Sequence, residues 1–228
     1  MTCVRVLFLG NSYTYVNDLP GTFARLASSG DRAVEVAMVA NGGETLAQHS
    51  ASSDSMNKLG SQGWSFVVLQ EQSETPATPA GRSYMYPAVR ALTGRIQAGG
   101  ATPLFFMTWA HRDGLPGSGT PSYESMQLAI NDGYQGIARE LGVAVAPVGY
   151  TWSVVRKEHS EISLWQDDGS HPSTAGTYLA ACVFYAAVFR HSPEGLTFED
   201  GLPDTQARVL QSEAGHTVLD LQAQWGLR

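Results

Sequence analysis

Short apolar runs alternate with longer amphipathic stretches along most of the chain. The runs are rich in β-branched and aromatic residues, which is typical of strands buried on both faces of a parallel sheet. They predict strands over residues 4–9, 34–39, 66–69, 103–107 and 143–148. Strands that alternate with helices in this way indicate an α/β fold. We therefore expect a three-layer α/β/α sandwich around a five-stranded parallel sheet.

The stretches between these runs predict helices, which polar caps and glycines delimit. The first is expected over residues 17–29, with Asn17 or Asp18 as its cap and Gly30 at its end. Further helices are predicted over residues 82–98, 123–141, 150–159, 173–190 and 204–225. The last of these is amphipathic. It could cover an edge of the sandwich or pack against a second copy of the chain in a homodimer.

The composition indicates one sizeable domain over residues 1–228. Of the 228 residues, 43% are hydrophobic and 15% are charged, which suits a single full core. The formal net charge is −7 and the pI is about 5.3. Such a field repels polyanions, so neither nucleic acid nor an anionic membrane is expected as a partner.

The chain shows no secretory signal, because the first apolar run is short, contains Arg5 and is needed as a strand. The longest apolar stretch, residues 178–189, is too short to span a bilayer. We expect a cytoplasmic protein, or a secreted one if a leader has been lost. Cys3, in the first strand, and Cys182, in a late helix, are expected to be small core residues without a disulfide.

Ser12 follows the first predicted strand with Gly10 and Asn11 between them. Open α/β sheets place their ligands at the carboxyl ends of the strands, where a Ser can present its hydroxyl beside helix-start amides. This position suits a nucleophile. A Ser that only caps the following turn would give the same pattern, because Ser is a favoured cap residue.

Asp168 and His171 lie three residues apart in a loop near the far end of the chain. Over a turn at Gly169, the carboxylate could hold one imidazole nitrogen while the other faces Ser12. That arrangement supplies a base and the group that orients it. Alternatively, Asp168 belongs to an ordinary turn and His171 only precedes the helix that follows.

Together these motifs resemble those of the SGNH or GDSL-type serine hydrolases, over residues 4 to about 189. In that family the nucleophile lies in a Gly-Asp-Ser type sequence after the first strand, which Gly10-Asn11-Ser12 matches here. The family's Asp-x-x-His block is matched by Asp168 and His171. The resemblance implies a catalytic triad of Ser12, His171 and Asp168 on a flavodoxin-like sandwich.

The resemblance also implies an oxyanion hole. Gly43, after the second strand, is the best match for the glycine whose backbone amide binds the oxyanion. The family's Gly-x-Asn-Asp block falls on Gln70-Glu71-Gln72-Ser73, so that Gln72 replaces the oxyanion-binding Asn. Its side chain still carries an amide donor. Ser12, Gly43 and Gln72 would then form the hole, with Gln70 as the alternative to Gln72.

A serine esterase that forms an acyl-enzyme on Ser12 is the activity that the resemblance implies. The family acts on short acyl esters, O-acetylated sugars, lipids and thioesters. Because no long apolar lid is evident, we expect a short acyl or O-acetyl group on a carbohydrate or small metabolite. The alternatives are a lipase or thioesterase for longer chains, and a non-catalytic carbohydrate-binding protein with a degenerate hydrolase fold.

Aromatic and cationic side chains are expected to surround this site. Trp109 and His111 follow the fourth strand, and Tyr13 and Trp165 flank the catalytic motifs, so these four are candidates for the substrate pocket. Tyr15 could contribute to the same rim. The aromatic residues could equally pack in the core.

The implied chemistry needs no metal and no cofactor, and we expect neither. His49, His111 and His159 are scattered along the chain and lack the spacing of metal ligands. We expect them at the surface or at the rim of the site.

Overall fold

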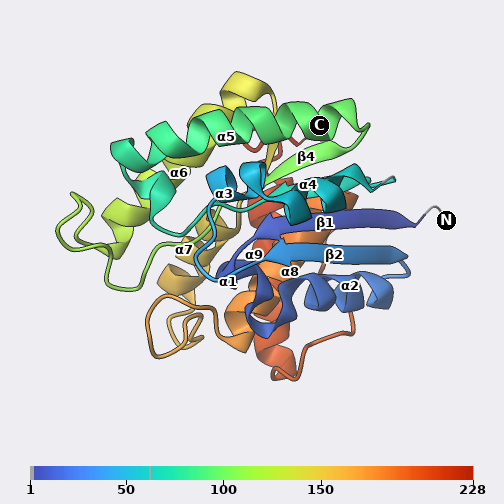
Figure 1. Cartoon of the computed structure of the whole chain (residues 1–228). Coiled ribbons are helices and arrows are strands. Elements are labelled where there is room, and N and C mark those ends of the chain that lie inside the picture. Colours follow the sequence, from blue (N-terminus) through green and yellow to red (C-terminus); the bar gives the residue numbers. More distant parts are fainter. Residues whose placement is uncertain (1–2, 62, 228) are drawn as a thin grey trace.

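The computed structural model of the chain describes residues 3–61 and 63–227. Within them, parallel strands form one five-stranded sheet in the order β2-β1-β3-β4-β5 (Figure 1). The strands are β1 (Val4–Gly10), β2 (Val34–Ala40), β3 (Phe66–Leu69), β4 (Thr102–Phe106) and β5 (Ala144–Ala146). In β1, the side chains from Val6 to Leu9 are fully buried, as a strand covered on both faces requires. The predicted α/β class and five-stranded parallel sheet are confirmed.

Helices cover both faces of the sheet (Figure 1). The helices α2, α8 and α9 pack together on one face, and α3 to α6 lie on the other. Their bounds are α1 (Ser12–Tyr15), α2 (Leu19–Ser29), α3 (Leu46–Ala51), α4 (Ser53–Gly60), α5 (Pro79–Ala98), α6 (Tyr123–Leu141), α7 (Val148–Glu158), α8 (Thr174–Phe189) and α9 (Asp204–Leu219), with short 3-10 turns at Val16–Asp18 and Thr75–Ala77.

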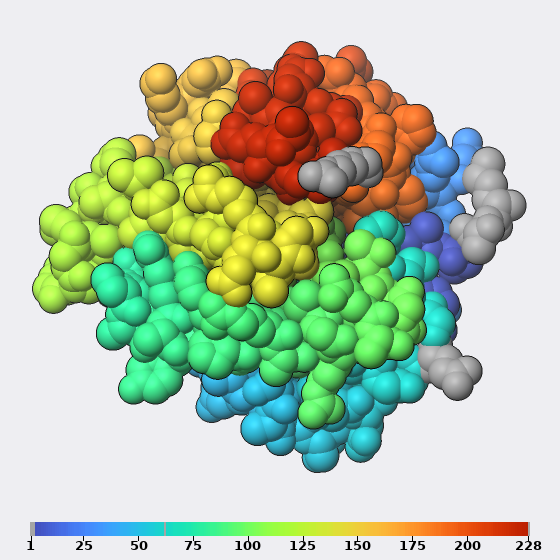
Figure 2. Space-filling model, turned by 90° about the horizontal axis from the view of Figure 1, so that it is seen from above, coloured from blue at the N-terminus to red at the C-terminus, as the bar shows by residue number. Residues whose placement is uncertain are grey.

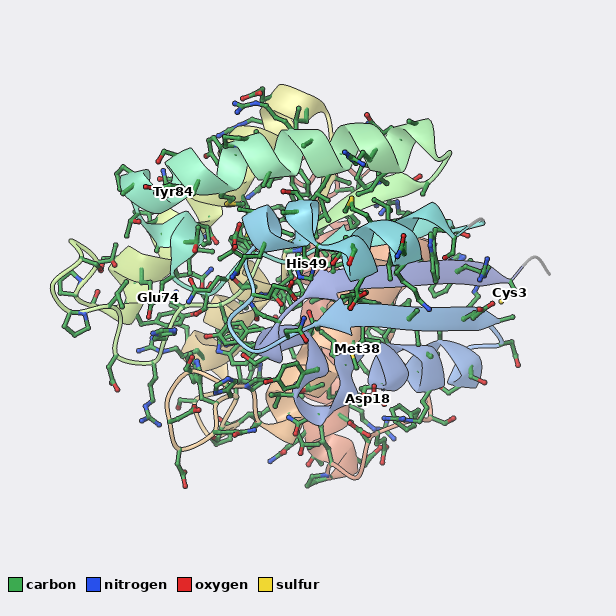
Figure 3. The ribbon with its side chains drawn as sticks, viewed as in Figure 1. Cys3, Asp18, Met38, His49, Glu74 and Tyr84 are labelled. Atoms are coloured by element: carbon green, nitrogen blue, oxygen red, sulfur yellow. The ribbon has the colours of Figure 1, made fainter. Side chains whose placement is uncertain are left out.

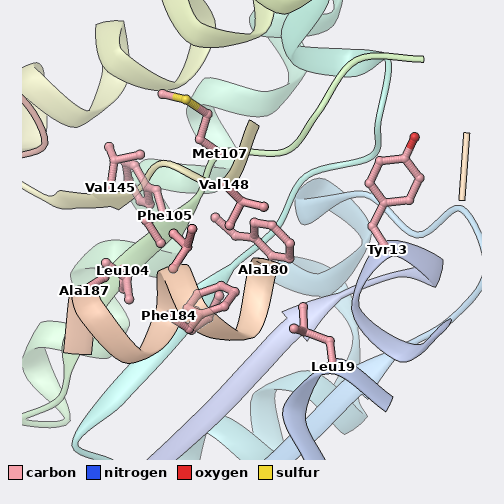
Figure 4. Close-up of a cluster of buried hydrophobic side chains, with 14 of the residues drawn as sticks. Tyr13, Leu19, Leu104, Phe105, Met107, Val145, Val148, Ala180, Phe184 and Ala187 are labelled. Atoms are coloured by element: carbon pink, nitrogen blue, oxygen red, sulfur yellow. The ribbon is translucent and has the colours of Figure 1, made fainter. Parts of the chain in front are cut away.

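The helix α8 is buried on nearly all of its sides. Figure 4 shows Phe184 and Ala187 of this helix beside Leu104 of β4, and the Phe184 ring meets the ring of Phe106 of the same strand edge-on, with centroids 5.0 Å apart. The Phe184 ring also meets the ring of Phe8 edge-on, with centroids 5.3 Å apart. Apolar as α8 is, no helix in the described part of the chain is both long and apolar enough to cross a membrane.

The C-terminal helix is shorter than predicted, because α9 ends at Leu219 and the chain then folds back in turns. The buried Trp225 donates its indole N–H to the Thr217 carbonyl at 2.8 Å, and its own carbonyl accepts from Val145 of β5 at 2.9 Å. This segment therefore covers the edge strand of the sheet, as one of the two alternatives predicted. Figure 2 shows it in red, beside the yellow end of α6.

The sequence pattern did not predict the helices α3 and α4. Both are short, with six and eight residues, so each has too few turns for a helical repeat to be recognised in the sequence. Their caps define them instead, since Thr45 forms a capping box at α3 and the Ser52 side chain caps α4. Together they carry the chain from β2 to β3 across the face of the sheet.

The expectation that both cysteines lie in the core is half wrong. Cys182 is buried in α8, but Cys3 is exposed, because it precedes β1 and lies beyond the covered part of the sheet (Figure 3). The same figure shows Glu74 at the opposite end of the sheet. That opposite end is where the carboxyl ends of the strands lie.

Candidate active site

Ser12 is the first residue of α1, just past the carboxyl end of β1. Gly10 ends the strand where no side chain would fit, because a Cβ there would lie 2.3 Å from Thr14 Oγ1 and 2.5 Å from Gln70 Oε1. Asn11 then caps α1 by accepting a hydrogen bond from a backbone N–H of its first turn. This tight turn leaves Ser12 half-buried at the edge of the sheet.

His171 lies between Ser12 and Asp168. Its Nε2 is 3.0 Å from Ser12 Oγ, and its Nδ1 is 2.6 Å from Asp168 Oδ2. Because an ionised carboxylate can only accept, Nδ1 carries the proton and Nε2 is free to accept the hydroxyl proton of Ser12. The structure thus brings together the three residues that were predicted as nucleophile, base and orienting acid.

Asp168 is held in its ionised form by its hydrogen bonds. Its Oδ1 accepts from the backbone N–H groups of Ser170 and His171, each at 2.9 Å. Desolvation raises the pKa of Asp168, but these two bonds and the one from the imidazole outweigh it and lower the pKa to about 2. The turn depends on Gly169, whose φ of +69° favours glycine.

A stack of aromatic rings supports the loop of residues 163–173, which carries Asp168 and His171. The ring of Trp109 stacks between Tyr13, at 4.4 Å, and Trp152, at 4.1 Å. Trp109 also donates its indole N–H to the Ser170 carbonyl at 2.9 Å, and the Tyr13 hydroxyl lies 2.8 Å from the Ser170 hydroxyl. These contacts fix the backbone directly beside His171.

The prediction that Trp109 and Trp165 line the substrate pocket is therefore wrong. Trp109 is fully buried, and Trp165 is half-buried with its ring against Trp152. Trp165 donates its indole N–H to the Ala110 carbonyl at 3.2 Å. The Trp109 indole supports the loop of residues 163–173, and Trp165, which belongs to that loop, anchors it to Ala110 and Trp152.

An open cavity of about 410 Å³ lies over Ser12 and His171. Tyr13 and His111 line it, as predicted, and so does Tyr15, which is 39% exposed. The other lining residues are small or polar, namely Asn11, Gly42, Gly43, Gln72, Ser73, Glu74 and Ser170. Burial lowers the pKa of His111 below its usual range, which favours a neutral imidazole in the cavity wall.

Two backbone N–H groups beside Ser12 are free to bind an anion. Within residues 3–61 and 63–227, the N–H groups of Ser12 and Gly43 donate to no protein acceptor. Gly43 has a φ of +69°, and a Cβ built there would meet nothing within 4 Å. Its glycine character is therefore required by backbone conformation and not by lack of space.

The side chains of Gln72 and Gln70 have different surroundings. Gln72 Oε1 accepts from Glu74 N at 2.9 Å, Thr75 N at 3.1 Å and Thr75 Oγ1 at 3.0 Å. The Gln72 amide nitrogen donates to Ser73 Oγ at 3.3 Å, and Gln72 lines the cavity. Gln70 is fully buried, and it does not line the cavity.

Other polar residues join the loops around the site, and the sequence patterns gave them no role. The Asn11 side chain donates to the Glu44 carbonyl at 3.0 Å, which ties the loop after β1 to the loop after β2. His49 is fully buried and not at the surface or rim as expected. Its Nε2 donates to the Gly10 carbonyl at 2.8 Å, and its Nδ1 lies 2.8 Å from Ser55 Oγ. No local motif marks these contacts, because their partners are distant in sequence.

One group of side chains in the described residues could hold a metal ion, formed by Glu158, His159 and Glu213. One ligand atom of each lies within 4.8 Å of the others. His159 is partly buried against Glu213, with Nε2 to Oε1 at 3.4 Å. None of the three lines the cavity over Ser12.

Comparisons with known proteins find similar solved structures, while no family model and no curated protein matches the chain. A candidate SGNH hydrolase from Slackia heliotrinireducens is 31% identical, and the alignment covers 80% of this chain and 97% of that one, with a TM-score of 0.67. A DUF4886 family protein from Bacteroides uniformis is 18% identical over 96% of this chain and 95% of that one, with a TM-score of 0.78.

An acetylxylan esterase from Geobacillus stearothermophilus has the same fold at lower identity. It is 14% identical, over 79% of this chain and 92% of its own, with a TM-score of 0.62. At such identity the likeness concerns the fold alone. The match to the Slackia protein, by contrast, combines 31% sequence identity with coverage of 97% of that protein's chain.

Proposed function

Since this chain belongs to the SGNH hydrolase family, we propose that it is a serine esterase that works through an acyl-enzyme on Ser12. The observation that carries this proposal is the continuous line of hydrogen bonds from Asp168 through His171 to Ser12. If Ser12 only capped a turn, its hydroxyl would not be expected to face an imidazole whose other nitrogen is bound to a carboxylate.

In the proposed reaction, His171 Nε2 takes the proton of the Ser12 hydroxyl as the oxygen attacks the ester carbonyl carbon. The imidazolium then protonates the leaving alcohol, and the acyl group stays on Ser12. Water, deprotonated by His171, attacks the acyl carbon and releases the acid and free Ser12. Asp168, with its low pKa, stays ionised throughout and stabilises the positive charge on His171.

The residues predicted for the oxyanion hole, Ser12, Gly43 and Gln72, all line the cavity over Ser12. We assign the oxyanion donors to the backbone N–H groups of Ser12 and Gly43 and to the Gln72 side-chain amide. This assignment is supported by the N–H groups of Ser12 and Gly43, which donate to no acceptor within the described residues, and by the Gln72 amide, whose oxygen accepts three hydrogen bonds. One such donor typically contributes about 3 to 4 kcal/mol to the transition state.

For the substrate we propose a short acyl or O-acetyl ester of a carbohydrate or another polar alcohol. The cavity is lined by hydroxyls, amides, a carboxylate and glycines, which suits a polyol better than a long hydrocarbon chain. Tyr15 is an exposed aromatic ring at this cavity, and such rings stack on sugar faces. The name of the Geobacillus acetylxylan esterase, a structural neighbour, agrees with this substrate class.

Labelling with a fluorophosphonate probe tests the nucleophile, because the probe reacts only with an activated serine. The wild-type protein should be labelled and Ser12→Ala should not. A p-nitrophenyl ester series should show the highest kcat/KM at acetate and a fall with chain length, and acetylated xylo-oligosaccharides should be deacetylated. Absence of labelling would contradict the esterase proposal and favour a non-catalytic carbohydrate-binding protein. A preference for long acyl chains would indicate a lipase or thioesterase.

A further inference from the structure

Glu71 is a fully buried carboxyl group between the loops that follow β2 and β3. Its Oε1 accepts two backbone hydrogen bonds, one from Gln72 N at 2.7 Å and one from Leu46 N at 3.2 Å. Leu46 is the first residue of α3, only three residues after Gly43. One oxygen atom therefore joins the backbone of both loops that carry the proposed oxyanion donors Gly43 and Gln72.

Glu71 is itself anchored to the core. Its backbone N–H donates to the Tyr134 hydroxyl of α6 at 3.0 Å, and its carbonyl accepts from the side-chain amide of Gln70. Tyr134 is also fully buried. The carboxyl group thus has a fixed position from which it can hold the two loops.

The second carboxyl oxygen makes this arrangement costly for folding. Among the described residues, Glu71 Oε2 is buried and has no hydrogen-bond partner. Desolvation raises the pKa of Glu71 to about 7, although the two backbone bonds act against it. A buried polar atom without a partner destabilises a fold, so stability alone does not explain a carboxyl group here.

We propose that Glu71 is a positioning residue that sets the geometry of the oxyanion hole through the backbones of Leu46 and Gln72. The inference rests on the proposed esterase function. Glu71 does not line the cavity over Ser12 and touches no reacting atom. Loss of its two hydrogen bonds would let Gly43 and Gln72 move relative to Ser12, and a displaced donor loses transition-state stabilisation while substrate binding is retained.

The test compares Glu71→Met with Glu71→Gln, using p-nitrophenyl acetate as the substrate. Methionine fills a similar volume but cannot accept from the two amides, whereas glutamine keeps an oxygen at that place. We expect Glu71→Met to lower kcat about tenfold to hundredfold with KM within about twofold, and Glu71→Gln to recover kcat to within about threefold of wild type. If Glu71→Met does not melt cooperatively, Glu71→Asp, which withdraws the carboxylate by one carbon, takes its place with the same expectation.

Thr93→Val is the matched control. Thr93 Oγ1 is likewise buried without a partner, but it lies on α5 and not between the loops, so this variant should keep its kcat. A folded Glu71→Met that retains the wild-type kcat would overturn the inference, as would a Glu71→Gln variant as slow as Glu71→Met. Fluorophosphonate labelling of the wild type separates the two proposals. If Ser12 is not labelled, the proposed esterase function is contradicted as well. If Ser12 is labelled and Glu71→Met keeps the wild-type kcat, only the proposed role of Glu71 is contradicted.

Discussion

The side-chain amide of Gln70 makes two hydrogen bonds with Asn11, one through its oxygen and one through its nitrogen. Gln70 Oε1 lies 2.8 Å from the Asn11 backbone nitrogen, and Gln70 Nε2 lies 3.0 Å from Asn11 Oδ1. The same Oε1 also accepts from Thr14 Oγ1 at 2.9 Å. The residue before the proposed nucleophile is thus held by the strand next to it, and Gln70 has no donor left for a substrate.

Replacement of Gln70 by leucine should therefore destabilise the fold and also slow the enzyme. The change removes the buried partner of the Asn11 N–H and of the Thr14 hydroxyl, and one of the two donors to Asn11 Oδ1, at a cost on the order of 3 kcal/mol. Urea unfolding measures the loss. An unfolding midpoint equal to that of the wild type would contradict the supporting role of Gln70.

Replacement of Gln72 by alanine should slow the enzyme strongly and change its stability little. Gln72 lines the cavity, so we expect stability within about 1 kcal/mol of wild type and kcat lowered by on the order of 10² to 10³, with little change in KM. Gln72→Glu should be at least as slow, because it replaces a donor with an anion. If kcat is unchanged in Gln72→Ala, the two backbone amides form the whole oxyanion hole.

Asp168→Asn should lower kcat by about 10³ to 10⁴, because the amide no longer holds the imidazole proton on Nδ1. Asp167→Asn is the matched control, since the Asp167 side chain is exposed and its backbone carbonyl, which the change keeps, accepts from Arg112. Steady-state kinetics on p-nitrophenyl acetate compares the two. A larger loss in Asp167→Asn would mean that the acid is misassigned.

The parts of the fold that the sequence predicted are those with strong local signals. The strand at Phe66–Leu69 and the helix Tyr123–Leu141 have the bounds predicted, because an apolar run and a long amphipathic repeat each require one structure. The polar helices α3 and α4 were missed, since their stability comes from caps and tertiary contacts. The C-terminal helix was predicted too long, because a tertiary contact ends it: the chain turns back after Leu219 and Trp225 accepts a hydrogen bond from Val145 of β5.

The candidate site divides in the same way. Ser12, Asp168 and His171 lie in short motifs whose neighbours determine the turn, so their meeting could be anticipated from the sequence. The direction of a side chain that follows a strand could not be, and Trp109 points into the core where a rim was expected. Glu71 was not distinguished at all, because its partner Leu46 is distant in sequence.

The last prediction concerns the pH dependence of stability, which Glu71 should influence in a defined direction. The carboxyl has a pKa of about 7 in the folded protein, against an ordinary value of 4.5. Below about pH 4.5 both states are protonated, and above about pH 7 both are ionised. Between these limits the folded state binds more protons, so the free energy of unfolding falls as the pH rises.

Comparison with Glu71→Gln, which cannot titrate, isolates this contribution from those of the other ionisable groups. Relative to that variant, the wild type should lose about 1.4 kcal/mol per pH unit within the window, or about 3 kcal/mol in all, and the difference should be constant outside it. Urea unfolding of both proteins at pH 4.5, 6 and 8 gives the measurement. A difference in unfolding free energy that stays constant across the three pH values would show that Glu71 has the same pKa folded and unfolded. The second carboxyl oxygen would then have a partner, such as a buried water, and the cost inferred from its burial would disappear.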